Sequence, residues 1–279
     1  MALSDRQFSQ LSAFIRERAG IKMSDVKRTM LEGRLQKRLR ALGMSSHDEY
    51  CNFVFSEAGQ KQELIHMIDV VTTNKTDFFR EPSHFDYLSK VVVPAMTERH
   101  GLGGRNNKFK IWSAGCSTGE EPYTLAMVLS ELRQAHDGKV PDAEIFATDI
   151  STRVLEHARK AIYAEDRIHP IPEALRRKYL LRSRDRSSGL VRIDGELRRM
   201  LRFGRLNFMD EDFGLRERFH TIFCRNVIIY FDKPTQERLM HKFCRHLVDG
   251  GYLFLGHSES LHGFHLPLRQ VAPTVYQRD

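Results

Sequence analysis

Residues 111–123 constrain the fold of this chain more than any other segment. The apolar run Ile-Trp-Ser-Ala breaks into the loop Gly-Cys-Ser-Thr-Gly, and two acids, Glu120 and Glu121, then open a helical pattern. A strand that passes through such a loop into a helix is typical of the first βα unit of a doubly wound α/β sheet, where nucleotide-type ligands bind. The loop glycines, Gly115 and Gly119, would let the backbone approach that ligand closely.

A further acid stands where the next strand of such a sheet would end. Asp149 closes the stretch that begins at Glu144, about thirty residues after Glu120, the length of one βαβ unit. A carboxylate there can accept both hydroxyls of a ribose, or it can serve the helix that Ser151 caps. Acids in place of an Arg/Lys cradle indicate a ligand with hydroxyls and an amine rather than a triphosphate.

Composition and charge limit the class of protein. The chain has 279 residues and 41% hydrophobic content, which predicts a soluble globular protein with one large or two modest cores. No apolar run approaches a membrane span, and the N-terminus shows no secretory pattern. Four cysteines without Cys-x-x-Cys spacing predict reduced thiols, a cytoplasmic location and no metal site. The net charge of +8 suits nucleic acid and an acidic protein partner alike.

The first seventy or so residues show only helical periodicity. A helix is predicted from near Ser24 to Leu42, where Gly43 ends it, and another covers 62–71. We therefore predict a small all-helical N-terminal domain over residues 1–75.

The helix that ends at Leu42 has a basic side. Its leucines share one face, and four of its cations fall mainly off that face: Arg34, Lys37, Arg38 and Arg40. A solvated surface is the ordinary interpretation of such a pattern, and a docking surface for an acidic partner is the alternative.

Strand and helix signals alternate from residue 108 onward. After the strand at 109–113, parallel-type strands are predicted at 144–148, 201–206, 221–224 and 251–255. The tail 268–277 reads as a final antiparallel strand that completes a terminal hairpin. Short strand-like pieces interrupt the alternation over about 163–204 and predict a small antiparallel insertion. Residues 76–279 are thus predicted to form a doubly wound, Rossmann-like domain of methyltransferase type, since the Gly-x-Gly-x-x-Gly of nicotinamide-binding folds is missing.

Four motifs, in this order, resemble those of one known family. They are Thr-Asn-Lys-Thr-Asp-Phe-Phe-Arg at 73–80, Trp-Ser-Ala-Gly-Cys-Ser-Thr-Gly-Glu-Glu-Pro-Tyr at 112–123, Cys-Arg-Asn-Val-Ile-Ile-Tyr-Phe at 224–231 and Gly-His-Ser-Glu at 256–259. Over essentially its whole length, the chain resembles the CheR family, the glutamate O-methyltransferases of chemotaxis receptors. The resemblance implies a helical domain followed by an α/β domain that binds S-adenosylmethionine (SAM) and carries a small β insertion.

The resemblance also implies the residues of the site. SAM and its product S-adenosylhomocysteine would be bound by nine residues: Asn74, Thr76, Arg80, Glu121, Asp149, Asn207, Phe208, Arg225 and Asn226. Arg80 and Tyr230 would be the catalytic residues that face the reacting groups. Because a glutamate carboxylate is already ionised near neutral pH, the site would orient it and exclude water rather than supply a base.

The implied partners are the acidic cytoplasmic helices of methyl-accepting chemotaxis receptors, whose methyl esters set sensory adaptation. The basic helix is predicted to dock on them. In part of the family the insertion also binds the receptor's C-terminal peptide, and here the piece 189–193 would offer the strand edge. The turn 183–189 has one glycine where tether-binding relatives have more. A tether and an insertion that only covers the cofactor cleft therefore both stay open.

Two other functions compete with receptor methylation. One is a basic methyltransferase that acts on nucleic acid, and the other is a non-catalytic SAM-binding receptor adaptor. The stretch Arg225-Asn226-Val227-Ile228-Ile229-Tyr230 stands where enzymes that methylate the adenine amino group carry Asn-Pro-Pro-Tyr. We therefore predict a monomeric enzyme with no nucleic-acid partner and no direct membrane insertion.

Overall fold

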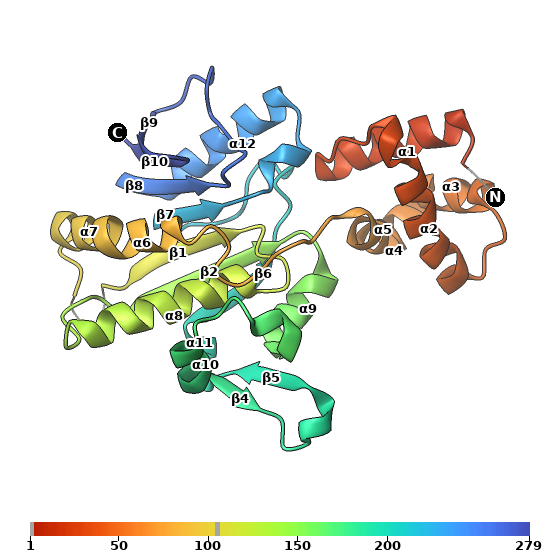
Figure 1. The fold of residues 1–279 in the computed structure, drawn as a ribbon. Coiled ribbons are helices and arrows are strands. Elements are labelled where there is room, and N and C mark those ends of the chain that lie inside the picture. The colour runs from red at the N-terminus through yellow and green to blue at the C-terminus, as the bar shows by residue number, and fades with distance from the viewer. Residues whose placement is uncertain (1–2, 104–106) are drawn as a thin grey trace.

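The chain consists of a helical unit and a sheet domain that stand side by side (Figure 1) in this computed structural model, which describes residues 3–103 and 107–279. The helices of the helical unit are α1 (Asp5–Ala19), α2 (Arg28–Leu42), α3 (His47–Phe55), α4 (Glu57–Gln62) and α5 (Leu64–Val71). Buried leucines of α2, Leu31, Leu35 and Leu39, pack in the core of this unit. The sheet domain begins after the connecting segment 72–82, which crosses from one unit to the other.

Capping explains where α2 begins and ends. Ser24 makes no side-chain capping bond, the 3₁₀ turn Asp25–Lys27 follows it, and the α-helix itself begins at Arg28. The predicted start near Ser24 is therefore about one turn too early. Gly43 ends the helix with a φ of 68°, as the sequence predicts.

The sheet domain is built on a seven-stranded sheet in the order β6-β2-β1-β7-β8-β10-β9. Its strands are β1 (Phe109–Ala114), β2 (Ala143–Asp149), β6 (Leu201–Arg205), β7 (Phe219–Cys224), β8 (Leu247–Leu255), β9 (Leu268–Ala272) and β10 (Val275–Arg278). The first five in spatial order run parallel, whereas β10 is antiparallel to β8 and β9. The predicted doubly wound α/β sheet is confirmed.

The C-terminal hairpin differs in detail from the prediction. The stretch for which the sequence predicts one strand contains β9 and all of β10 but its last residue. The chain turns at Pro273 and Thr274, where Thr274 has a φ of 55°. Proline has no N–H to donate to a strand ladder, so the strand ends there.

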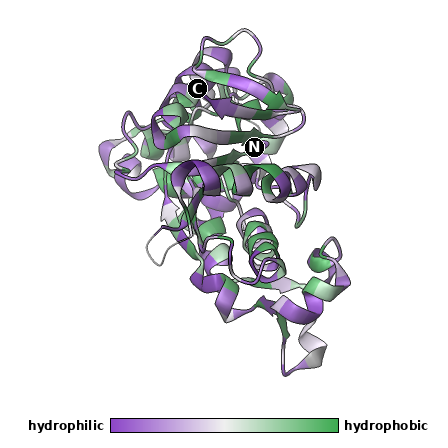
Figure 2. Cartoon of the chain, turned by 90° about the vertical axis from the view of Figure 1, so that its left-hand side faces the viewer, coloured by the Kyte–Doolittle hydropathy of each residue, from purple (hydrophilic) through white to green (hydrophobic). Residues whose placement is uncertain are grey.

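Helices cover both faces of the sheet, whose middle is lined with apolar residues (Figure 2). The run α6 (Ser83–Tyr87), Leu88–Val92 and α7 (Val93–His100) packs on one face with α8 (Glu120–Ala135). On the other face, α12 (Lys233–His246) packs through Phe243 against Trp112 of β1. α9 (Thr152–Lys160) lies beside β2 and β6. The described residues contain no helix that is long and apolar enough to cross a membrane.

The predicted insertion is a separate three-stranded sheet that protrudes from the domain (Figure 1). It contains β3 (Ile162–Ala164), the 3₁₀ turn Glu165–Ile168, α10 (Glu173–Tyr179), β4 (Leu180–Arg182), the 3₁₀ turn Arg186–Ser188, β5 (Leu190–Ile193) and α11 (Gly195–Arg199). The strand order is β3-β5-β4, so β5 is paired on both sides. The prediction that 189–193 offers a free edge is therefore wrong, and the edges of this small sheet are β3 and β4.

Candidate active site

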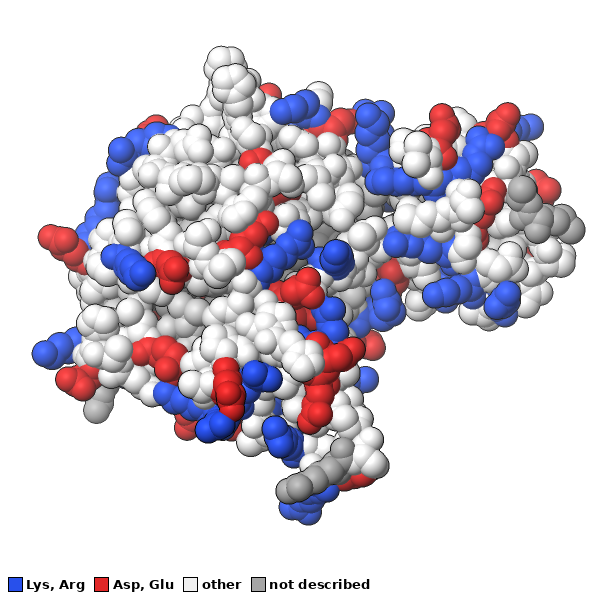
Figure 3. All heavy atoms as spheres, in the orientation of Figure 1, with Lys and Arg blue, Asp and Glu red and all other residues white. Residues whose placement is uncertain are grey.

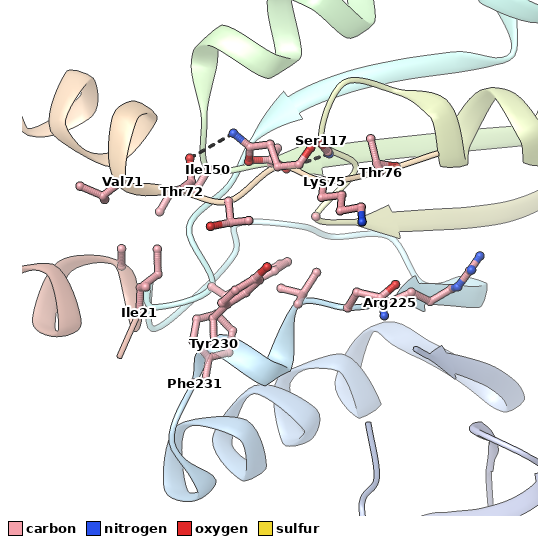
Figure 4. A pocket seen from close by; sticks show the side chains of 18 of the residues that line it. Ile21, Val71, Thr72, Lys75, Thr76, Ser117, Ile150, Arg225, Tyr230 and Phe231 are labelled. Carbon is pink, nitrogen blue, oxygen red and sulfur yellow. Dashed lines mark hydrogen bonds between the residues drawn. The ribbon is translucent and has the colours of Figure 1, made fainter. Parts of the chain in front are cut away.

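A pocket lies between the helical unit and the loops that follow four neighbouring parallel strands, β6, β2, β1 and β7. All the predicted cofactor-binding and catalytic residues line it: Asn74, Thr76, Arg80, Glu121, Asp149, Asn207, Phe208, Arg225, Asn226 and Tyr230. They converge because parallel strands end at the same edge of a sheet. In Figure 4, Tyr230 and Phe231 lie across the pocket from Lys75, Thr76 and Ser117. Their individual roles stay predictions.

The helical unit supplies a wall of the pocket that the sequence did not predict. Ile21, Met23 and Lys27, between α1 and α2, line it. The Lys22 backbone N–H donates to the Tyr230 carbonyl at 2.9 Å, and Lys27 Nζ lies 5.6 Å from the centre of the Tyr230 ring. The linker between α1 and α2 has no hydrophobic periodicity, so no sequence pattern indicates that it lines the pocket.

Gly115 and Gly119 shape the loop after β1. Both have positive φ, 86° and 100°. A Cβ at Gly115 would lie 2.6 Å from Val227 Cγ2, and one at Gly119 would lie 2.8 Å from Tyr163 Oη. The close approaches that require glycine are thus to protein neighbours, whereas the sequence predicts an approach to the ligand.

Asp149 ends β2 in the wall of the pocket and is 8% exposed. Its Oδ2 accepts the Ser117 backbone N–H and its Oδ1 accepts the Ser151 backbone N–H, both at 2.9 Å. Burial raises the pKa of Asp149, although these two N–H groups oppose the rise. Each oxygen keeps further acceptor capacity. The carboxylate can therefore accept ribose hydroxyls while it also orders the start of α9.

Glu121 and the buried Arg225 form a charged pair in the wall of the pocket. Ser113 Oγ donates to Glu121 Oε1 at 2.7 Å, and Arg225 Nη1 lies 3.5 Å from Glu121 Oε2. Burial raises the pKa of Glu121, and Arg225 acts in the opposite direction. Among the described residues, no group accepts a hydrogen bond from Arg225 Nη1, whose side chain is 2% exposed. An orphaned buried donor of this kind marks a place for another polar partner.

These groups fit SAM. Asp149 suits the ribose hydroxyls, Glu121 suits the ammonium group, and the orphaned Arg225 Nη1 suits the carboxylate of the amino-acid end. Asn207 fits less well, because protein engages both ends of its amide. Its Nδ2 donates to the Arg18 carbonyl at 2.7 Å, and its Oδ1 accepts the Met209 backbone N–H at 3.1 Å. Asn207 therefore joins the helical unit to the loop after β6.

Two of the four predicted docking residues have internal partners. Arg34 Nη1 donates to the carbonyls of Val71 and Thr72 at 2.7 and 2.9 Å. Arg38 makes two hydrogen bonds, each 2.7 Å, to the carboxylate of Glu63, which is 1% exposed. These two arginines therefore contribute contacts within the helical unit, and their docking role stays a prediction.

Lys37 and Arg40, the other two predicted docking residues, are exposed on α2. Figure 3 shows Lys and Arg side chains gathered on the helical unit. A docking role for Lys37 and Arg40 thus stays a prediction.

Among the described residues, one group of potential metal ligands is found, and its members do not line the pocket. Atoms of Glu81, His84 and His257 lie within 4.8 Å of one another. The Glu81 carboxylate already contacts the Arg225 guanidinium at 3.1 Å, which supplies the positive charge that a metal would bring. We therefore assign no metal to this cluster.

Models of one protein family match almost the whole chain. The SAM-binding domain of CheR methyltransferases matches residues 74–276, and their all-alpha domain matches residues 6–72. The chemotaxis protein methyltransferase of Borreliella burgdorferi is 41% identical and covers 98% of this chain and 94% of its own length. Those of Salmonella typhimurium and Escherichia coli are 38% and 37% identical, with 99% of this chain covered and 91% and 92% of their own lengths. The chain therefore belongs to the CheR methyltransferase family and is a methyltransferase that uses SAM.

Proposed function

We propose that this chain transfers a methyl group from SAM to glutamate side-chain carboxylates of chemotaxis receptors, forming methyl esters. The relatives support the receptor substrate, since each is named a chemotaxis protein methyltransferase. The observation that carries the carboxylate assignment is the composition of the pocket. It combines two acids suited to the cofactor, Glu121 and Asp149, with an arginine and a phenol suited to a carboxylate substrate, Arg80 and Tyr230.

The chemistry makes modest demands on these side chains. When bound, SAM supplies an electrophilic methyl group on a sulfonium centre. A glutamate carboxylate is ionised near neutral pH, so the pocket needs no general base. Arg80 or the Tyr230 hydroxyl would hold one carboxylate oxygen while the other faces the methyl group. Ile21 and Phe231, which line the same pocket, would help to exclude water.

The receptor helix would dock on the exposed cations of α2. Lys37 and Arg40 are exposed, whereas Arg34 and Arg38 make hydrogen bonds within the helical unit. An acidic helix laid along this side would bring its glutamate toward the pocket, to which the linker before α2 contributes Met23 and Lys27.

Observations support each of the two roles left open for the insertion. Its edge strand β4 is paired on one side only and exposes Leu181, which suits addition of a peptide strand. Arg167, in the turn after β3, donates to the Thr76 carbonyl at 2.5 Å and lies 3.1 Å from Glu120. The contacts of Arg167 suit an insertion that covers the cofactor cleft, and they are compatible with binding of the receptor's C-terminal peptide at β4.

We further propose that the protein acts as a monomer in the cytoplasm, without nucleic acid or membrane insertion. Its helical domain would end near residue 75, and its insertion would span about 163–204.

The decisive experiment is methyl transfer from labelled SAM to receptor. Receptor glutamates modified as esters release their label as methanol in mild base, and we expect such base-labile label on receptor protein. Label on RNA or DNA would favour a nucleic-acid methyltransferase. Tight binding of S-adenosylhomocysteine without any transfer to receptor would favour an adaptor.

A further inference from the structure

The turn that carries Arg80 has an uncommon backbone conformation. Phe79 and Glu81, on either side of Arg80, have positive φ of 53° and 57°. Residues with side chains of this size rarely adopt that region, and they do so where neighbouring contacts impose it. The contacts that hold this turn therefore decide where Arg80 lies.

The Glu81 carboxylate makes several of these contacts. Its Oε2 accepts a hydrogen bond from Arg225 Nε at 3.2 Å, and its Oε1 accepts the His257 backbone N–H at 3.2 Å and Asn226 Nδ2 at 3.4 Å. Arg225 and Asn226 follow β7, and His257 follows β8. One carboxylate thus ties the Arg80 turn to the ends of two strands, and it does so from outside the set of residues that line the pocket.

Glu81 also shares the charge of Arg225 with Glu121. The Arg225 guanidinium lies 3.1 Å from Glu81 Oε2 and 3.5 Å from Glu121 Oε2, and it donates to the Arg80 carbonyl. One buried guanidinium therefore faces two carboxylates. Burial acts to raise the pKa of Glu81, but Arg225 and the His257 N–H outweigh it, and the pKa is lowered. Burial dominates for Glu121, whose pKa is raised.

We propose that Glu81 is a positioning residue that supplies the counter-charge to Arg225 and thereby leaves the Glu121 carboxylate available to the cofactor's amino group. This inference rests on the proposed contact between Glu121 and that group. Without the charge on Glu81, Glu121 would be the one carboxylate among the described residues that neutralises Arg225, and the ties of the Arg80 turn to β7 and β8 would weaken. Binding of the amino-acid end of the cofactor would then weaken.

Matched substitutions at residue 81 in the full chain test the charge. Glu81→Gln keeps the shape and removes the charge. Glu81→Asp and Glu81→Asn form a second pair of equal shape, in which the amide removes the charge and one acceptor oxygen. Both residues tolerate a left-handed backbone, so this pair serves if the Gln variant does not fold. Calorimetric titration with S-adenosylhomocysteine should show a loss of about ten- to a hundredfold in affinity for Gln relative to wild type, and for Asn relative to Asp. Melting temperatures without ligand check the fold.

The outcomes separate this inference from the proposed function. Wild-type affinity in folded Glu81→Gln, or equal affinities of the Asp and Asn variants, would overturn the role of the Glu81 charge. Glu121→Gln is the companion variant. If Glu121→Gln loses affinity for S-adenosylhomocysteine and Glu81→Gln does not, only the role of Glu81 is rejected. If Glu121→Gln binds with wild-type affinity, both the proposed contact of Glu121 with the amino group and the role of Glu81 are rejected.

Discussion

Arg38 is predicted to stabilise the helical unit rather than to bind a partner. Its guanidinium makes two 2.7 Å hydrogen bonds to Glu63, whose side chain is 1% exposed, and Tyr50 Oη donates to the same carboxylate at 3.0 Å. The Glu63 carboxylate raises the pKa of Arg38 through these hydrogen bonds, so the guanidinium stays charged. Arg38→Met removes the positive charge and leaves Glu63 buried with one neutral donor.

The expected cost is large because a charge would be left without compensation. Breaking one side of a buried ion pair typically costs about 3–5 kcal/mol, a large part of the stability of a small helical unit. Denaturant unfolding, followed by circular dichroism, measures the change in the free energy of unfolding. Receptor methylation should fall in parallel through loss of folded protein.

Two matched variants make this test specific. Arg40→Met makes the same change at an exposed position of α2 and should alter stability by less than about 0.5 kcal/mol. Arg38→Met combined with Glu63→Gln removes both charges and should recover much of the loss. If Arg38→Met proves as stable as Arg40→Met, the argument from the buried pair is refuted.

Four further predictions concern the site and the response to pH. Asp149→Ala should weaken S-adenosylhomocysteine binding by about 1–3 kcal/mol in calorimetry, and unchanged affinity would remove its assignment to the ribose. Tyr230→Phe should lower kcat by about ten- to a hundredfold with little change in cofactor affinity, unless the ring only packs. Reversal of Lys37 and Arg40 to Glu should raise the KM for receptor, and moderate salt should mimic it; a KM insensitive to both contradicts docking. Burial, aided by His100, lowers the pKa of His220 to about 4 from its ordinary 6.5. The unfolded chain therefore binds a proton that the folded protein does not between these pH values, and stability should fall as pH drops from 6.5 to 4, by up to about 1.4 kcal/mol per unit. Burial also lowers the pKa of His84 to about 4, so His84 adds to this slope. His220→Asn should therefore reduce the slope by the His220 share, which pH-dependent unfolding would show.

The sequence predicts the sheet-side wall of the pocket because strand ends are a local signal. Asp149 and Arg225 each follow a run of buried residues, and a parallel sheet brings such ends to one edge whatever the strand order. The wall formed by Ile21 and Met23 has no such signal. It depends on how the helical unit sits against the sheet domain, which is fixed by contacts such as the one between Asn207 and Arg18. Contacts between units leave no periodic trace in either sequence segment.

What the sequence does not show about α2 and β5 has one physical cause. Leucine spacing shows one buried face of α2, but α5 and the segment just before it bury its flank as well, and Arg34 and Arg38 lie on that flank. Likewise, the alternation in β5 indicates a strand, but only pairing with both β3 and β4 shows that it is central. Periodicity describes one element, whereas the number of its neighbours is a property of the fold.

Arg225 shows what a motif leaves undetermined. The resemblance places this residue at the cofactor site, and the structure agrees that it lines the pocket. Its guanidinium, however, is largely occupied by Glu81, Glu121 and the Arg80 carbonyl, and only Nη1 lacks a hydrogen-bond acceptor among the described residues. A substitution at Arg225 would therefore disturb two carboxylates and the Arg80 turn at once. Loss of cofactor binding in an Arg225 variant could therefore not be assigned to the loss of one contact. Glu81→Gln is the more informative substitution, because it removes a charge and keeps the shape of the side chain.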